Sequence, residues 1–157
     1  CIPIALGVSR PDAQVWGVEL SSQAFSYLKQ NLALNGAGNV AAVAGDVFSL
    51  PPEVTQRKYR LITANPPYIP RGELPGLQQE VQAEPAMALD GGPDGLDFYR
   101  RLPSLCAPLL DQGGALLFEI GDDQGNAVSA LMREAGYQKV QVLQDLSGLD
   151  RVVFGFF

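Results

Sequence analysis

Four consecutive residues, Asn65, Pro66, Pro67 and Tyr68, could together bind a planar nitrogen group, and they follow an apolar run at 61–64. Proline has no N–H to donate and fixes φ, so the proline pair ends a strand at Asn65 and stiffens the chain beyond it. The amide of Asn65 and the Pro66 carbonyl then lie at the carboxyl end of a strand, where open α/β sheets bind ligands. Two such acceptors suit an –NH2 group, and Tyr68 offers a flat apolar wall. The alternative is a rigid turn that only terminates an edge strand.

Two acidic residues, Glu19 and Asp46, close two earlier strand-like segments. In dinucleotide-binding folds an acid at the position of Glu19 forms hydrogen bonds with ribose hydroxyls. Asp46 could accept a hydrogen bond from an adenine amino group. Each also has a structural alternative, since Glu19 could stabilise a helix N-terminus and Asp46 could form an Asx turn. Taken with Asn65, the three strand ends predict a ribose, an adenine and an amine site in that order.

The composition excludes several classes of chemistry. The 157 residues include no histidine, which rules out serine–histidine and cysteine–histidine catalysis within this chain. Cys1 and Cys106 have no metal-ligand spacing, so we predict no metal site. The net charge of -6 offers no basic stripe, so no direct nucleic-acid binding is expected. No apolar stretch approaches the ~20 residues of a membrane span, so no membrane contact and a cytoplasmic location are expected.

Strands that alternate with helices must position these residues, and they predict a doubly wound, mostly parallel α/β sheet. Between them, residues 69–95 are rich in Pro, Gly and Glu and predict a long irregular connection. A glycine pair at 113–114 predicts a break before the fourth strand, and a turn at 146–148 predicts an antiparallel C-terminal pair. Expected strands are 14–19, 40–44, 59–64, 115–120, 138–143 and 151–157. Expected helices are 1–7, 21–36, 96–110 and 124–135.

Several motifs together resemble a known family. Asn-Pro-Pro-Tyr after a strand is typical of class I methyltransferases, which methylate exocyclic or amide nitrogens with S-adenosylmethionine. The narrower resemblance, over nearly all of the chain, is to the release-factor glutamine methyltransferases. It is carried by these further segments: Leu77–Val81, Glu84-Pro85, Ala88-Leu89, Gly91-Gly92, Asp94-Gly95-Leu96, Phe98-Tyr99, Glu119-Ile120-Gly121, Gln124-Gly125, Ala135-Gly136-Tyr137, Asp145–Gly148 and Asp150-Arg151.

The resemblance implies transfer of a methyl group from S-adenosylmethionine to the side-chain amide nitrogen of the glutamine in the Gly-Gly-Gln motif of peptide chain release factors. S-adenosylhomocysteine would be the other product. The implied catalytic residues are Asn65, Pro66, Pro67 and Tyr68. The implied cofactor contacts are Glu19, Leu20, Asp46, Val47 and Asn65, and the implied substrate contacts are Asn65, Pro66, Tyr68 and Glu84.

The resemblance also predicts the domain organisation. Residues 1–157 are expected to form a single methyltransferase catalytic domain that is truncated at its N-terminus, because the family's Gly-x-Gly-Ser-Gly loop normally stands directly before the residues that match Cys1 onward. Two alternatives stay open from the sequence: a methyltransferase that acts on nucleobase amines of DNA or ribosomal RNA, and a non-catalytic remnant that lacks the cofactor loop.

Overall fold

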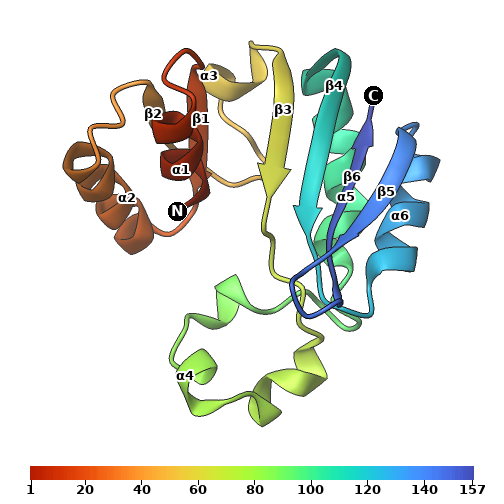
Figure 1. Cartoon of the computed structure of the whole chain (residues 1–157). Helices are drawn as coiled ribbons and strands as arrows, with labels where there is room; N and C mark the ends of the chain where they lie inside the picture. Colours follow the sequence, from red (N-terminus) through yellow and green to blue (C-terminus); the bar gives the residue numbers. More distant parts are fainter. The chain divides into compact units, whose positions relative to one another are not determined.

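The computed structural model describes residues 1–157, and the chain divides into two compact units. Unit 1 comprises Cys1–Arg57 and unit 2 comprises Lys58–Phe157. Each unit has its own sheet, with two strands in unit 1 and four strands in unit 2 (Figure 1). The two units are therefore described separately.

Unit 1 is a two-stranded parallel sheet with α1 and α2 packed against it. The register pairs Val15 with Val40 and Glu19 with Ala44, so both strands end at the same edge. The Ser21 hydroxyl caps α2 by accepting from the Ala24 N–H at 3.3 Å. The elements in chain order are α1 (Ile2–Ser9), β1 (Val15–Glu19), α2 (Ser22–Leu34), β2 (Val40–Ala44) and α3 (Pro52–Thr55).

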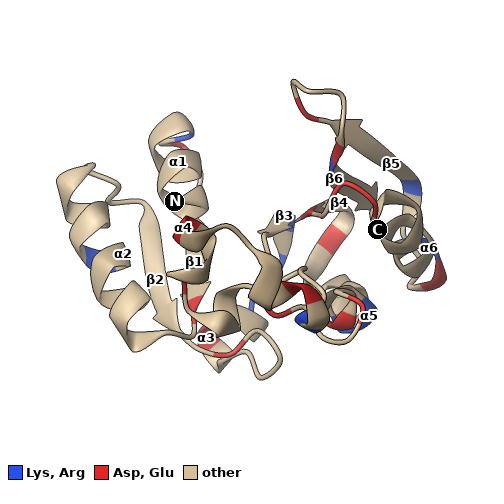
Figure 2. Cartoon of the chain, turned by 90° about the horizontal axis from the view of Figure 1, so that it is seen from below, with Lys and Arg blue, Asp and Glu red and all other residues tan.

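Glycines let α1 approach this sheet closely. A Cβ at Gly7 would lie 2.2 Å from Val40 Cγ2, and a Cβ at Gly17 would lie 2.9 Å from the Pro3 ring. Real Cβ atoms do not approach so closely, so a larger residue at either position would push α1 off the strands. The sequence of α1 carries no charge between Ile2 and Ser9, which fits a helix that packs on a sheet (Figure 2).

Unit 2 is a four-stranded mixed sheet in the order β3-β4-β6-β5. β3 and β4 are parallel, and β6 runs antiparallel to both of its neighbours, β4 and β5. α5 and α6 pack against each other and against this sheet (Figure 1). The elements in chain order are β3 (Tyr59–Ala64), η1 (Arg71–Gly76), α4 (Gln79–Gln82), η2 (Ala86–Ala88), α5 (Asp97–Cys106), η3 (Ala107–Leu109), β4 (Leu110–Glu119), α6 (Gly125–Glu134), β5 (Gln138–Gln144) and β6 (Asp150–Phe156).

The main core lies in unit 2, between the sheet and the α5–α6 pair. Tyr99 and Phe118 meet edge to face with ring centroids 5.3 Å apart, an arrangement that aromatic quadrupoles favour. The fully buried side chains of this core are Tyr99, Leu102, Pro103, Leu116, Phe118, Ile120, Val128, Met132 and Val153. Helix α6 contributes its buried face at Val128 and Met132, and the core also takes in Phe118, near the carboxyl end of β4.

Most of the predicted elements are confirmed, three differ, and the short helix α3 was not predicted. The expected break at 113–114 falls inside β4, which already pairs at Leu110 with Tyr59; an irregular register after Tyr59 accommodates the glycines. The predicted irregular segment 69–95 contains three short helical turns, η1, α4 and η2. The predicted helix 96–110 ends at Cys106 and continues as η3, because Pro108 cannot donate to an α-helical ladder.

The structure contains no helix whose length and hydropathy would suit a membrane span.

Candidate functional site

In unit 1, the two predicted acids lie at one edge of the sheet. Glu19 is the last residue of β1 and pairs with Ala44, the last residue of β2. The Gly45 N–H donates to the Glu19 carbonyl at 3.0 Å, and Asp46 follows directly. Both carboxylates are half-buried. The structure therefore brings Glu19 and Asp46 to the same carboxyl edge, as the strand pattern predicted.

Each of these carboxylates has one oxygen in a local hydrogen bond. Glu19 Oε1 accepts from the Ser21 N–H at 2.8 Å, just before α2 begins. Asp46 Oδ1 accepts from the Phe48 N–H at 2.8 Å, which is an Asx turn. The local roles considered for both residues are thus realised, yet Glu19 Oε2 and Asp46 Oδ2 make no hydrogen bond within the chain. One acceptor of each carboxylate stays available for a ligand. Their neighbours differ in exposure, since Leu20 is exposed and Val47 is half-buried.

In unit 2, the segment Asn65–Tyr68 leaves β3 as predicted. The strand ends at Ala64, and neither Pro66 nor Pro67 can donate to a ladder. Asn65 is exposed and Pro66 is buried, while Pro67 and Tyr68 are half-buried. The Asn65 amide makes no hydrogen bond within the chain, so its oxygen and its –NH2 group are both open to a ligand at a strand's carboxyl end.

The far end of this segment is held by a short parallel bridge between Ile69 and Asp90. The Ile69 N–H donates to the Leu89 carbonyl at 3.0 Å, and the Gly91 N–H donates to the Ile69 carbonyl at 2.9 Å. An ion pair between Arg71 and Asp90, 2.9 Å long, lies beside the bridge. The helical segment from η1 to η2 is therefore closed at its base.

Two glycines allow the chain to pass close to Tyr68. A Cβ at Gly91 would lie 2.8 Å from Tyr68 Cα, and a Cβ at Gly95 would lie 2.3 Å from the Tyr68 carbonyl oxygen. Gly95 also has φ +77, a left-handed conformation that glycine adopts without strain. These glycines were matched to a family motif in the sequence, but their role beside Tyr68 could not be predicted from spacing.

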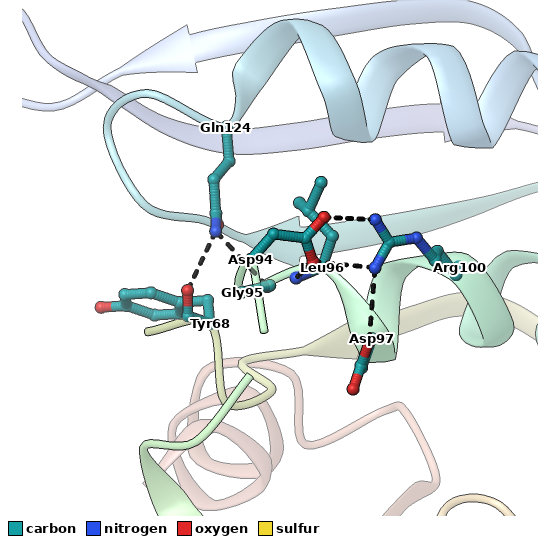
Figure 3. Close-up of polar contacts among 7 residues, drawn as sticks. All are labelled: Tyr68, Asp94, Gly95, Leu96, Asp97, Arg100 and Gln124. Carbon is teal, nitrogen blue, oxygen red and sulfur yellow. Dashed lines mark hydrogen bonds and ion pairs between the residues drawn. The ribbon is translucent and has the colours of Figure 1, made fainter. Parts of the chain in front are cut away.

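A buried amide completes this arrangement. Gln124 is 6% exposed, and its Nε2 donates to the Tyr68 carbonyl at 2.9 Å and to the Gly95 carbonyl at 3.4 Å (Figure 3). Its Oε1 accepts from the Gly121 N–H at 3.0 Å. The Tyr68 ring extends away from Gln124 (Figure 3). Sequence reasoning assigned no role to Gln124, because no local pattern links residues 56 positions apart.

The turn that contains Gly95 is anchored by charges at the start of α5. Asp94 accepts from the Leu96 N–H at 3.2 Å, and Arg100 binds both Asp94 oxygens (Figure 3). The hydrogen bond from Arg100 holds the pKa of Asp94 at about 2, below its usual range. Arg100 also reaches Asp97 at 3.3 Å, so acidic and basic residues lie together on α5 (Figure 2). Exposed pairs of this kind contribute little stability each.

Glu84 and Cys106, two further candidate residues, make no polar contact with the Asn65–Tyr68 segment. Glu84 is exposed between α4 and η2 and makes no hydrogen bond or ion pair through its side chain. Cys106 is buried, and burial raises the pKa of its thiol to about 12, so it stays protonated and inert. No group of three or more acidic or cysteine side chains could hold a metal ion.

Comparison with known proteins gives a consistent result. No family model matches, but curated relatives match almost the whole chain. The release factor glutamine methyltransferase of Moorella thermoacetica is 43% identical over 157 residues, which is 99% of this chain and 54% of that protein. The protein of the same name from Thermodesulfovibrio yellowstonii is 37% identical over 98% of this chain and 54% of its own length. The chain thus spans about half the length of the curated relatives it matches.

Solved structures share the fold. The hMettl16 catalytic domain, solved in complex with the MAT2A 3'UTR hairpin 1, superposes with a TM-score of 0.74 at 17% identity and covers 99% of this chain and 59% of that one. The chain therefore has the Rossmann-like α/β fold of class I methyltransferases, as predicted. The relatives confirm the resemblance read from the sequence, and the chain is a homologue of release factor glutamine methyltransferases over nearly all of its length.

Proposed function

We propose that this chain, a homologue of release factor glutamine methyltransferases, carries the catalytic residues of such an enzyme. The reaction is transfer of a methyl group from S-adenosylmethionine to the side-chain amide nitrogen of the glutamine in the Gly-Gly-Gln motif of a peptide chain release factor. The single observation that carries this proposal is the Asn65 amide, which is exposed and unpartnered at the end of β3 and is followed by a stiff proline pair. We also propose that residues 1–157 act as one catalytic domain, and that the enzyme works in the cytoplasm.

The residues present fit S-adenosylmethionine in chemical type. A ribose donates through its hydroxyls and an adenine donates through its amino group, and Glu19 and Asp46 each keep a free carboxylate oxygen that can accept such hydrogen bonds. Glu19 would bind the ribose, Asp46 would bind the adenine, and Leu20 and Val47 would supply apolar contacts. When bound, the cofactor supplies an electrophilic methyl group.

The nucleophile sets what the protein must supply. An amide nitrogen is a poor nucleophile because its lone pair is delocalised into the neighbouring carbonyl. Asn65 Oδ1 and the Pro66 carbonyl would accept hydrogen bonds from the two N–H groups of the substrate glutamine, and one of these protons passes to water as the nitrogen gains the methyl group. These acceptors orient the nitrogen and stabilise the positive charge that develops on it, so no strong general base is needed. This account suits a chain without histidine. Pro67 keeps the segment stiff, and Tyr68 would pack against the glutamine.

The substrate is proposed to be a protein. Glu84, exposed and without an intramolecular partner, would contact the release factor from the segment that follows α4. The alternative substrate, a nucleobase amine, presents the same –NH2 chemistry to Asn65. The net charge of -6 does not favour it, because binding to a phosphate backbone depends on clustered cationic side chains.

Methyl-labelled S-adenosylmethionine tests the proposal on the full-length protein. We expect label on the glutamine of a release factor, located by mass spectrometry, and none on a matched release factor with Gly-Gly-Glu at that position, whose carboxylate has no nitrogen. DNA and ribosomal RNA are assayed in parallel. Label on nucleic acid alone would assign the nucleobase activity, and cofactor binding without transfer to any substrate would assign a binding module.

A further inference from the structure

The Asn65–Tyr68 segment cannot be held by hydrogen bonds of its own. Pro66 and Pro67 have no N–H, and the Asn65 side chain makes no bond within the chain. Beyond the prolines, the first main-chain group fixed from outside the segment is the Tyr68 carbonyl, which accepts from Gln124 Nε2 at 2.9 Å. A group that sets the direction of this carbonyl also limits the rotations available to the peptide units before it.

The hydrogen bonds of Gln124 fix the orientation of its side-chain amide. Its two donors face the carbonyls of Tyr68 and Gly95, and its one acceptor faces the Gly121 N–H. A flipped amide would place oxygen against two carbonyls and nitrogen against an N–H, so these partners assign the orientation without ambiguity. At 6% exposure, a hydrogen bond lost here would leave a buried polar group without its partner, which is costly.

The contact with Tyr68 is not needed for the local structure around Gln124. Gln124 is the N-cap of α6, but its side chain makes no capping hydrogen bond to that helix. The bond from Oε1 to Gly121 closes the turn after β4, whereas the bonds from Nε2 reach residues 56 and 29 positions away. The Nε2 bonds therefore do not start α6; they connect its N-terminus to Tyr68 and Gly95.

We propose that Gln124 is a positioning residue for methyl transfer. By fixing the Tyr68 carbonyl it sets the direction in which the Pro66 carbonyl and the Asn65 amide face the substrate glutamine. This inference rests on the proposed function and adds a residue outside the Asn-Pro-Pro-Tyr motif. The dependence on orientation is steep, since a small displacement of a catalytic group costs about a hundredfold in rate.

Two variants separate positioning from packing. Gln124→Met keeps the length of the side chain and removes every hydrogen bond. Gln124→Glu keeps an acceptor for the Gly121 N–H but replaces the Nε2 donor by an oxygen that faces the Tyr68 carbonyl. Tyr137→Phe is the matched control, because it removes a buried hydrogen bond of 3.0 Å to the Pro103 carbonyl, away from Tyr68.

In the full-length protein, both Gln124 variants should lower kcat for release-factor methylation by about ten- to a hundredfold. KM for the release factor and the dissociation constant of S-adenosylmethionine should stay within about twofold of wild type, below the tenfold that one lost hydrogen bond can cost. Assays are run below the unfolding transition of each variant. Unchanged kcat in both variants, or an equal loss in Tyr137→Phe, would overturn the proposal.

Hydrogen–deuterium exchange tests the same contact without any methyl transfer. The N–H groups of Ile69 and Gly91, which close the base beside Tyr68, should exchange about tenfold faster in both Gln124 variants and at the wild-type rate in Tyr137→Phe. Unchanged exchange at these two amides would overturn the positioning role. Failure of the proposed function is distinct, because the wild-type protein would then transfer no methyl group to the release factor.

Discussion

The acidic pair of unit 1 and the Asn65–Tyr68 segment of unit 2 are held in opposite ways. Glu19 and Asp46 each bond a backbone N–H only two residues ahead, so their orientation is set within their own turn. Tyr68 is held by Gln124 from 56 positions away and is approached by Gly91 and Gly95. Local contacts suffice to present a single acceptor to a ligand. Aligning a weak nucleophile requires a segment that the rest of the unit keeps in one direction.

The largest effect should come from the exposed end of that segment. Asn65→Ala removes one preorganised acceptor, so we expect turnover of the full-length protein to fall about a hundredfold or more. Cofactor affinity should barely change, and equilibrium titration with S-adenosylmethionine checks this. Near-normal turnover in the variant would remove Asn65 from the reaction and would leave the distant contacts around Tyr68 without a catalytic purpose.

A glycine pair tests the close approach to Tyr68. Gly95 and Gly113 have φ of +77 and +76, but a Cβ at Gly113 would meet nothing within 4 Å. Alanine at either position carries the same backbone strain. The difference between Gly95→Ala and Gly113→Ala therefore reports the close approach of Gly95 to the Tyr68 carbonyl oxygen, at 2.3 Å, and to Gln124 Nε2, at 2.6 Å. We expect the free energy of unfolding, measured by urea denaturation, to be lower in Gly95→Ala than in Gly113→Ala by about 1–3 kcal/mol. Equal losses in both variants would show that Tyr68 and Gln124 can both move aside.

The local arrangement should respond differently. Glu19→Ala should weaken S-adenosylmethionine binding by about 1–3 kcal/mol, the range for a hydrogen bond to a charged group, while turnover at saturating cofactor is mostly kept. Calorimetry measures the affinity. If the affinity is unchanged, Glu19 only accepts from the Ser21 N–H at the start of α2 and does not bind the cofactor. The contrast between the two regions would then be structural alone.

The smallest effect concerns the charges beside Gly95. Because the pKa of Asp94 is held at about 2, ionised Asp94 favours the folded state above its ordinary pKa, and this contribution disappears as the pH falls toward 2. Asp94→Asn keeps an acceptor for the Leu96 N–H but cannot titrate. Between about pH 4 and pH 2, the unfolding free energy of Asp94→Asn should therefore fall less steeply than that of the wild type. Parallel curves for the two proteins would contradict this assignment.

The same contrast explains what the sequence could predict. Strand ends at Glu19, Asp46 and Asn65 follow from short patterns of apolar, acidic and proline residues, and the structure confirms those positions. The roles of Gly91, Gly95 and Gln124 depend on contacts between distant parts of unit 2, which periodicity cannot reveal. The early start of β4 was missed for a related reason, since pairing of Leu110 with Tyr59 overrides the glycine pair inside the strand.

The bridge between Ile69 and Asp90 has a consequence for how this protein can vary. Because both ends of the segment from Arg71 to Ala88 leave from adjacent points, its length hardly affects the spacing of the residues at its base. Doubling the length of a flexible loop costs only about 0.6 kcal/mol in closure entropy. We therefore expect insertions, deletions and exchanges within this segment to leave Tyr68 in place, while they alter the substrate contact proposed for Glu84.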